Sequence, residues 1–478
     1  MTMYPNVTLT LVDGVRIVVP DSLDVVTTYV VREQGDWFED EIKFLRRLLQ
    51  PGQKVIDIGA NYGIYTLTTA KLVGPSGRVW AFEPASSTAE LLAASIATNN
   101  YSHVVLERSA LSSTTGTAQL SLNSNSELNE LVRAEQFAGE SETVPLVTLD
   151  AAMETHGWKG IDFVKIDAEG EESNILRGGL NFLATESPLI QFEVTAGNTL
   201  HLDLVQEFYA LGYKSYRLVP GLNVLVPFDS EEEDIVGYLL NLYCCKPDRA
   251  ALLAAQGFLI EAPSNPSYSQ NPTTTHVDST ISRGGAHGWR DTLAKLPYGK
   301  ELFEHWEKRV AEGQSGEVEE ALFLYALSHD ESFPMAERFP ALEASFHKLM
   351  RLCETQPVYL RLASLARVAR DYGARSVAVK SLAQLCNIIF QQRQVNPIEP
   401  FIAPGERFDS ISPQGSFGNW IAAVALEEFE KNQHFSSYYS VQSSAERLEI
   451  IRDLGFGSDE MKRRLALVRQ RVDAATNA

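Results

Sequence analysis

One segment, VIDIGANYG at positions 55–63, constrains the fold of this chain more than any other. A short apolar run ends in an acid, passes into a turn with glycines at 59 and 63, and opens into a helical pattern. In α/β proteins this order of strand, glycine turn and helix places a nucleotide-type cofactor at the carboxyl end of the first strand. The segment therefore predicts an α/β sheet with a cofactor at this turn.

The rest of the first half continues the alternation of strand and helix. β-Branched runs stand at 55–58, 79–82, 104–106, 163–166 and 189–194, and helical patterns at 65–73, 88–99, 171–183 and 199–211. Such alternation predicts a mostly parallel sheet with helices on both faces. A Ser/Thr/Asn-rich insertion at 112–148 is expected to add two strands, 118–122 and 144–147. The runs 213–218 and 238–244 are expected to close the sheet.

A chain of 478 residues is too long for a single core, and its pattern divides it into four parts. We predict a β-hairpin that turns at Asp13-Gly14, followed by a helix, in residues 1–50, capping the core. Residues 51–260 form the α/β domain. The Pro/Ser/Thr-rich stretch 261–288 is expected to be a linker, and 289–478 an all-α domain.

The helical domain offers one internal motif. Residues 366–385 are expected to form two helices around Gly373, a spacing similar to one tetratricopeptide unit. Because no clean neighbouring units are found at that period, an ordinary helical hairpin is the favoured interpretation. We expect this domain to hold the acceptor or a protein partner, or to associate with itself.

Charge and cysteine content exclude several classes of function. With 41 Lys and Arg against 62 Asp and Glu, the net charge of −21 opposes binding to nucleic acid. The four cysteines form no zinc pattern, which makes structural zinc improbable. No leader pattern and no long apolar run is present, so we expect a cytoplasmic protein without membrane insertion.

Two acids near the glycine turn indicate which cofactor binds. The turn lacks the third glycine of a dinucleotide fingerprint, and Asp57 would repel a pyrophosphate but suit an amino-bearing ligand. Glu83 ends the next strand, about 20 residues past the turn, where an acid commonly binds ribose hydroxyls. S-adenosyl-L-methionine fits both acids, whereas a nicotinamide cofactor is disfavoured. The alternative is a glycine turn that only packs strand against helix.

A second group of acids is expected where the fourth and fifth strands end. Asp167 follows the strand 163–166, Lys165 shares its face, and Glu169 lies in the next turn, while Glu193 ends the neighbouring strand. Carboxyl groups in such a position can accept a proton from a reacting group or hold a metal ion. Asp167 is the predicted base.

The same acids allow a second interpretation. Asp167, Glu169 and Glu193 are candidate ligands for Mg²⁺ or Ca²⁺, because hard cations prefer oxygen ligands. The structural alternatives are that Glu169 caps a helix and that Glu193 pairs with Lys165 or Arg177.

The order of these motifs resembles the FkbM family of S-adenosylmethionine-dependent methyltransferases over residues 37–245. The matching segments are VIDIGANYGIYT, VWAFEP, ERSALSSTTG, VPLVTLD, DFVKIDAEGEE, ILRGG and IQFEV. The resemblance implies a class I methyltransferase fold with seven strands in the order 3-2-1-4-5-7-6. It also implies cofactor contacts at Asp57, Gly59, Asn61, Gly63, Glu83, Ser109 and Asp167. Ala168 stands where the family often has valine.

We therefore expect an O-methyltransferase that acts on a hydroxyl of a sugar, a polysaccharide or another secondary metabolite. Asp167, Glu169 and Lys165 are its predicted catalytic residues. The alternative is an inactive methyltransferase fold that serves as a scaffold for protein interaction through its C-terminal helices.

Overall fold

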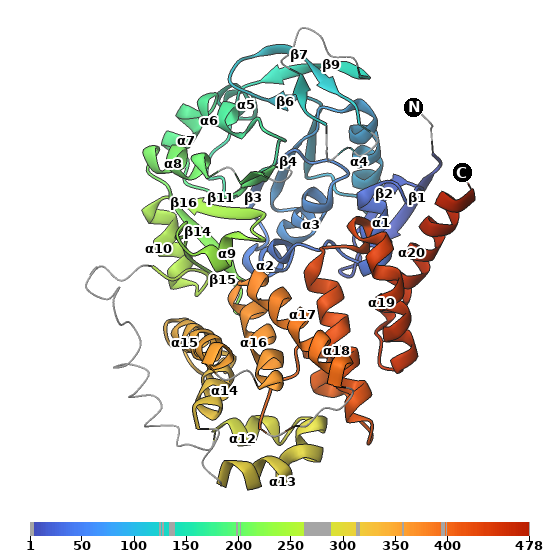
Figure 1. Ribbon diagram of the computed structural model, residues 1–478. Helices are drawn as coiled ribbons and strands as arrows, with labels where there is room; N and C mark the ends of the chain where they lie inside the picture. The colour runs from blue at the N-terminus through green and yellow to red at the C-terminus, as the bar shows by residue number, and fades with distance from the viewer. Residues whose placement is uncertain are drawn as a thin grey trace. The chain divides into compact units, whose positions relative to one another are not determined.

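The computed structural model describes residues 4–123, 126, 129–132, 139–196, 199–200, 202–261, 288–311, 316–355, 358–392, 397 and 399–477. They fall into two compact units (Figure 1). The first comprises residues 1–218, 225–230 and 239–261, and the second comprises 219–224, 231–238 and 262–478. Apart from its two ends, the predicted linker 261–288 lies outside the described residues, so the four-part division stays a prediction.

A mixed sheet forms the centre of the first unit. Its order is β15-β14-β16-β11-β10-β3-β4-β5. The strands are β3 (Lys54–Ile58), β4 (Arg78–Phe82), β5 (Val104–Glu107), β10 (Phe163–Ile166), β11 (Leu189–Glu193), β14 (Lys214–Val219), β15 (Val224–Pro227) and β16 (Asn241–Cys245). Without β15 this is the predicted order 3-2-1-4-5-7-6, and β16 runs antiparallel to both neighbours. The predicted fold class is confirmed.

The predicted number of strands, seven, is wrong. β15 adds an eighth strand, because the chain reverses after β14 through a turn in which Asn223 has a φ of +50°. The backbone of Leu225 also bonds to Phe258 and Ile260, which gives β15 partners on its other side. The sequence of β15 contains only a short apolar run, which is not among the predicted strands.

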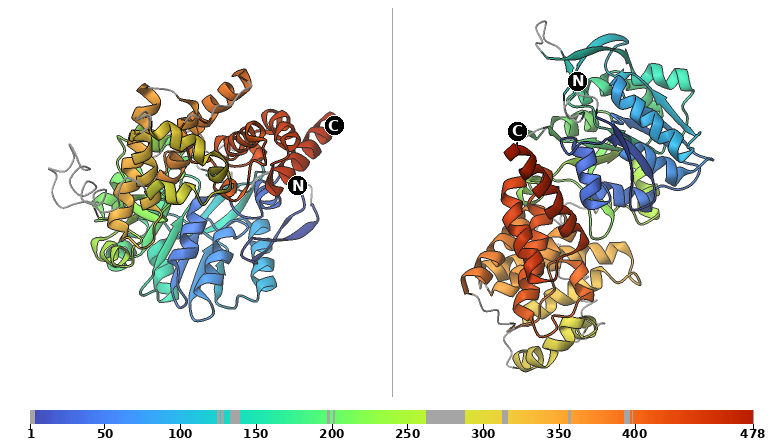
Figure 2. Two further views of the ribbon diagram at one scale, coloured as in Figure 1. Left: turned by 90° about the horizontal axis from the view of Figure 1, so that it is seen from below. Right: turned by 90° about the vertical axis from the view of Figure 1, so that its right-hand side faces the viewer.

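Helices cover both faces of this sheet (Figure 2). One apolar core joins a face of the sheet to α1 (Val26–Gln34), α2 (Asp40–Leu48), α3 (Ile64–Val73), α4 (Ser86–Asn99) and α10 (Pro247–Ala255). The other core joins the opposite face to α5 (Leu149–His156), α6 (Glu172–Arg177), α7 (Leu180–Thr185) and α8 (Asp203–Ala210). Residues 171–183, predicted as one helix, are α6 and α7. They break at Gly178, where a Cβ would lie 2.2 Å from the carbonyl oxygen of Ser112.

Smaller strands surround the central sheet. β1 (Asn6–Thr10) and β2 (Arg16–Pro20) form the predicted hairpin. Its loop is longer than a two-residue turn and has only Gly14 at positive φ, so it is not the type I′ turn that an Asp-Gly pair favours. The insertion forms a second sheet in the order β6-β9-β7-β8, with β6 (Ala110–Leu111), β7 (Gly116–Ser121), β8 (Leu131–Val132) and β9 (Ser141–Val147). β12 (Thr195–Ala196) pairs with β13 (Thr199–Leu200).

The second unit is helical, as predicted. Its helices are α9 (Glu233–Val236), α12 (Gly288–Leu293), α13 (Pro297–Ala311), α14 (Gly316–Ser328), α15 (Met335–Thr355), α16 (Tyr359–Tyr372), α17 (Arg375–Gln392), α18 (Phe417–Gln433), α19 (Val441–Leu454) and α20 (Asp459–Asn477). From α14 onward each helix packs against the next. The predicted pair around Gly373 is α16 and α17, and Gly373 ends α16 at a φ of +97°.

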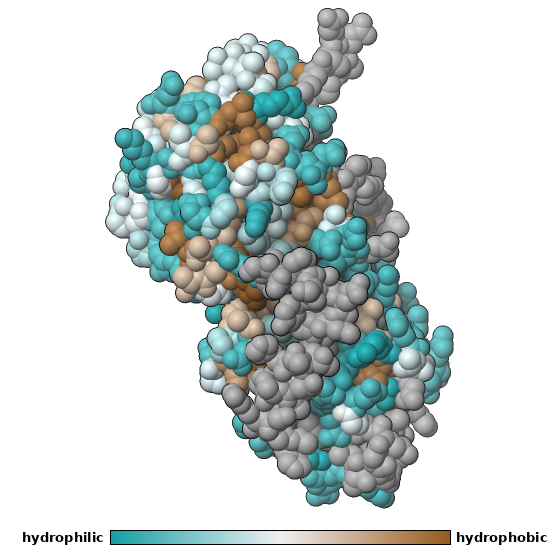
Figure 3. Space-filling view, turned by 90° about the vertical axis from the view of Figure 1, so that its left-hand side faces the viewer, coloured by the Kyte–Doolittle hydropathy of each residue, from teal (hydrophilic) through white to brown (hydrophobic). Residues whose placement is uncertain are grey.

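The surface is mixed in character. On the face that carries α7 and α8, apolar areas are broken up by polar ones (Figure 3). Leu180 on α7 and Tyr209 on α8 are exposed large apolar side chains. Within the described parts of the chain, no helix has the length and hydropathy that crossing a membrane would require.

Candidate functional site

The glycine turn connects β3 to α3, and its two glycines allow close contacts within the protein. Gly59 and Gly63 have φ values of +77° and +95°. A Cβ at Gly59 would lie 1.7 Å from the carbonyl oxygen of Asp167, and one at Gly63 would lie 2.4 Å from Leu92 Cδ1. These glycines let the turn pack against Asp167 and α4. The predicted approach of a ligand to the same glycines stays a prediction.

The backbone N–H groups of this turn are used inside the protein. Gly59 N and Ala60 N donate to Phe82 O, Asn61 N to Glu83 Oε2, Tyr62 N to Asn61 Oδ1, and Gly63 N to Ala60 O. A phosphate-binding turn would instead point such groups at its ligand. Because these N–H groups are already paired, the polar groups left at the turn are mainly hydrogen-bond acceptors. They suit a ligand with an amino group rather than a pyrophosphate.

Glu83 fixes this turn with both of its oxygens. Oε2 accepts from Asn61 N and Oε1 accepts from Ala85 N, each at 2.8 Å. Burial raises the pKa of Glu83 to about 7, although the two backbone hydrogen bonds oppose this shift. A carboxylate has about four lone-pair sites, so these bonds leave capacity for a ligand hydroxyl. The predicted ribose contact stays a prediction.

Asp57 is buried below the turn, with 1% of its surface exposed. Its Oδ2 accepts from Thr66 Oγ1 at 2.5 Å, whereas Oδ1 has no hydrogen-bond partner among the described residues. Burial raises the pKa of Asp57, and the charge of Lys165 opposes the shift. An unsatisfied buried acceptor is costly, so the site fits a ligand that brings a donor.

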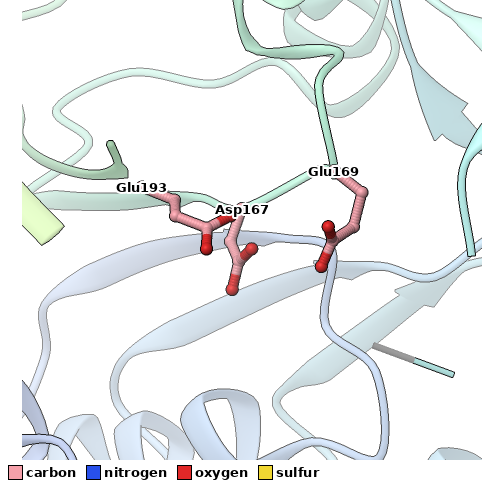
Figure 4. Close-up of side chains that lie close together, drawn as sticks. All are labelled: Asp167, Glu169 and Glu193. Carbon is pink, nitrogen blue, oxygen red and sulfur yellow. The ribbon is translucent and has the colours of Figure 1, made fainter. Parts of the chain in front are cut away.

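Asp167, Glu169 and Glu193 converge at the carboxyl ends of β10 and β11 (Figure 4). Each has an oxygen within 4.8 Å of an oxygen of the other two. Glu169 has a φ of +46° and Gly170 one of +91°, so the turn after β10 bends sharply at these residues. We refer to Asp167, Glu169 and Glu193 as the acid cluster.

The acid cluster retains a proton at neutral pH. Burial, reinforced by the nearby charges of Asp167 and Glu169, raises the pKa of Glu193 to about 10. Neighbouring carboxyls of this kind titrate as a unit, because ionising both would bring like charges together. Glu193 is therefore the member of the acid cluster that ionises least readily.

Lys165 lies on β10, two residues before Asp167. Its Nζ is 2.5 Å from Asp167 Oδ2, and its strand register places it directly opposite Asp57. The charges of Asp167, Asp57 and Glu39 hold the pKa of Lys165 above its ordinary value despite burial. The ion pair thus joins Lys165 to Asp167, and not to Glu193 as one alternative held.

The N-cap residue of α6 is Glu171, whose side chain makes no capping hydrogen bond. The alternative role of Glu169 as a cap of this helix stays a prediction. Glu172 is the acid that stabilises this turn, because its Oε1 accepts from Ala168 N at 2.9 Å.

A buried polar row that the sequence analysis missed supports these residues. Asp57, Lys165, Gln191 and Tyr243 lie opposite one another across β3, β10, β11 and β16. All four are buried. The sequence shows a polar residue between apolar ones in each of these strands. Only the pairing of the strands shows that the four polar residues form a row.

The remaining predicted residues flank the glycine turn. Asn61 has a φ of +48°, and its Oδ1 accepts from Ser126 Oγ of the insertion at 2.7 Å. Ser109 is buried between β5 and β6. The structure thus gathers Asp57, Asn61 and Glu83 at the turn and Lys165, Asp167, Glu169 and Glu193 beside it.

Comparison with known proteins identifies the α/β domain. Residues 57–215 match the family model described as Methyltransferase FkbM domain. This range contains the glycine turn, the polar side chains around it and the acid cluster. No curated protein matches the chain.

Solved structures also align with part of the chain. They include a methyltransferase FkbM from Methylobacillus flagellatus KT, at 18% identity and a TM-score of 0.29, over 40% of this chain and 43% of that one. A SAM-dependent methyltransferase from Aquifex aeolicus aligns at 14% identity and a TM-score of 0.26, over 47% and 94%. A SAM-dependent O-methyltransferase from Thermotoga maritima aligns at 16% identity and a TM-score of 0.25, over 51% and 78%. The chain thus spans less than half of the first relative.

Proposed function

Since residues 57–215 are a SAM-dependent methyltransferase domain of the FkbM family, we propose that this protein methylates a hydroxyl oxygen of a sugar, a polysaccharide or another secondary metabolite. The proposal rests chiefly on one observation. The Asp167 carboxylate, paired with Lys165 and adjoined by the neutral carboxyl of Glu193, lies beside a glycine turn rich in acceptors. A base thus adjoins the expected position of the methyl donor.

The residues divide into two groups by role. Asp57, Asn61, Glu83 and the turn at Gly59 and Gly63 are the proposed contacts of the amino and ribose groups of S-adenosyl-L-methionine, with Ser109 at the edge. Bound there, this cofactor supplies a methyl group on a positively charged sulfur. Asp167 takes the proton of the acceptor hydroxyl as its oxygen gains the methyl group, and Lys165 holds the Asp167 carboxyl in place through the ion pair.

Cofactor binding can be tested before the acceptor is known. Calorimetric titration with S-adenosyl-L-methionine and S-adenosylhomocysteine should give micromolar dissociation constants, about −8 kcal/mol. Glu83→Gln should weaken both at least tenfold. The matched control is Glu90→Gln on the exposed surface of α4, which should bind like the wild type. An equal loss in the control would remove the assignment of Glu83.

The reaction itself is tested with a panel of hydroxylated sugars and macrolides and labelled S-adenosyl-L-methionine. Asp167→Asn should retain cofactor affinity within threefold and lose transfer by at least a hundredfold, in the range of a lost general base. Full transfer by this variant would exclude Asp167 as the base.

The acid cluster leaves a second chemistry to be tested with the same assay. Mg²⁺ or Ca²⁺ held by Asp167, Glu169 and Glu193 would lower the pKa of the hydroxyl directly. Proton acceptance by Asp167 alone predicts the same rate with EDTA as with Mg²⁺. A tenfold loss in EDTA that Mg²⁺ restores would assign the cluster to a metal.

The alternative function is that of a scaffold, in which the methyltransferase fold carries the C-terminal helices for a protein partner. The polar row buried beneath the acid cluster favours the enzyme, because burying charges costs free energy that a scaffold does not require. Well-folded wild type that binds neither S-adenosyl-L-methionine nor S-adenosylhomocysteine would instead support the scaffold.

A further inference from the structure

The aromatic ring of Tyr65 lies next to the Lys165 ammonium below the acid cluster. Lys165 Nζ is 4.7 Å from the centroid of the ring, and the same atom bonds Asp167 Oδ2. Only 5% of Tyr65 and 4% of Lys165 is exposed. A cation at an aromatic face interacts more strongly when both are shielded from water. The lysine is therefore fixed by an aromatic partner as well as by a carboxylate.

The hydroxyl of Tyr65 is itself held on two sides. It donates to Glu39 Oε2 and accepts from Gln191 Nε2 at 3.1 Å. Gln191 is oriented in turn, because its Oε1 accepts from Tyr243 OH at 3.3 Å. These bonds restrict the tilt of the Tyr65 ring. Glu39 and Tyr243 lie outside residues 57–215, so part of this support lies beyond the matched family range.

We propose that Tyr65 is a positioning residue for the methyl transfer, because it holds Lys165 in place and Lys165 holds the carboxylate of Asp167. The expected effect on methyl transfer rests on the proposed function, whereas the expected effect on the position of Lys165 does not. A lysine has a long side chain with many rotamers, and a buried ring that occupies one side of it restricts them. Without the ring, Lys165 would have other acids to pair with, namely Asp57 from β3 and Glu39 before α2.

The test compares Tyr65→Leu with Tyr65→Phe in the full-length protein. The first variant removes the ring and the second removes only the hydroxyl. Nuclear magnetic resonance of lysine-labelled protein reports the Lys165 ammonium, assigned with Lys165→Arg. The hydrogens of the Lys165 ammonium should exchange slowly with water in wild type. Tyr65→Leu should lose this slowly exchanging resonance, and Tyr65→Phe should keep it. Transfer at saturating cofactor should fall at least tenfold in Tyr65→Leu and less than threefold in Tyr65→Phe, with the affinity for S-adenosylhomocysteine within threefold of wild type.

Tyr213→Leu is the matched control. Tyr213 is equally buried, and its ring lies 5.4 Å from Lys246 Nζ, outside the candidate site. This variant should lose a buried ring beside a lysine yet keep the Lys165 resonance and the transfer rate within threefold. If Tyr213→Leu lowers transfer as much as Tyr65→Leu does, the effect is general destabilisation and the proposal is overturned.

Two further outcomes decide the proposal. A Lys165 resonance that persists in Tyr65→Leu would overturn it. If Tyr65→Leu does not fold, Tyr65→Met replaces it, because this change also removes the ring while a flexible apolar side chain fills the space; it should lower transfer at least tenfold, and an unchanged rate would overturn the proposal. Failure of wild type to bind S-adenosylhomocysteine would instead contradict the proposed function, independently of the Lys165 resonance.

Discussion

At the scale of single residues, the candidate site is defined by carboxyl groups that burial makes hard to ionise. The pKa is raised to about 7 at Glu83 and to about 10 at Glu193, and desolvation is the largest cause in both cases. An acid whose pKa is raised by folding binds a proton that the unfolded chain has already lost. The free energy of unfolding must therefore decrease as pH rises above the ordinary glutamate range.

Glu193→Gln tests this at one residue. The amide imitates the neutral carboxyl, so the variant should not share the contribution of Glu193 to the pH dependence. Its advantage over wild type should grow from pH 5 to pH 9 and reach about 1 to 3 kcal/mol. Urea unfolding at several pH values measures the difference.

Glu90→Gln, a change at an exposed carboxyl on α4, provides the comparison. It should leave the slope of stability against pH as in wild type, because Glu90 is in water in both states. A parallel slope for Glu193→Gln and wild type would show that Glu193 is ionised in the folded protein.

At the scale of elements, the resemblance to the FkbM family implied the order of strands, and the apolar strands that end in acids predicted where the candidate site lies. Asp167 and Glu193 were placed together on that basis. The sequence could not show that Gly59 contacts the carbonyl of Asp167, or that Gln191 and Tyr243 align with Lys165, since both depend on strand register. β15 was missed because its apolar run is short and because part of its hydrogen bonding comes from distant residues such as Phe258.

The break between α6 and α7 gives a prediction at this scale. Gly178 has a φ of −80°, which any residue adopts, so only its contact with Ser112 requires glycine. Gly178→Ala should destabilise the protein by about 1 to 3 kcal/mol through overpacking against backbone. Gly418→Ala in α18, where a Cβ would meet no atom within 4 Å, should be neutral or slightly stabilising. Thermal unfolding of both variants checks this, and equal stabilities would contradict the steric explanation.

At the scale of the whole molecule, the chain order and the compact units do not coincide. The helical unit includes residues 219–224 and 231–238, which precede the predicted linker. Within that unit, Gly221 N donates to Asp371 O at 2.9 Å and Ser376 Oγ donates to Asp234 O at 2.6 Å. A cut at the linker therefore does not separate the two units cleanly.

Truncation after residue 261 tests this consequence. The backbone amide of Gly221 should lose its protection and exchange hydrogen at least tenfold faster in the truncated chain, since its acceptor is removed. The amides of β3 and β10 should keep their protection, because their partners lie in the central sheet. Mass spectrometry of both chains measures the rates. Unchanged exchange at Gly221 would mean that the two segments are stable without the helices.

The glycine turn has one more consequence, for the thermodynamics of binding. Because the N–H groups of residues 59–63 already have partners, the turn is folded before any ligand arrives. A ligand that binds there does not have to order the backbone, and its affinity is not reduced by that loss of entropy. The turn is thus a preorganised part of the candidate site.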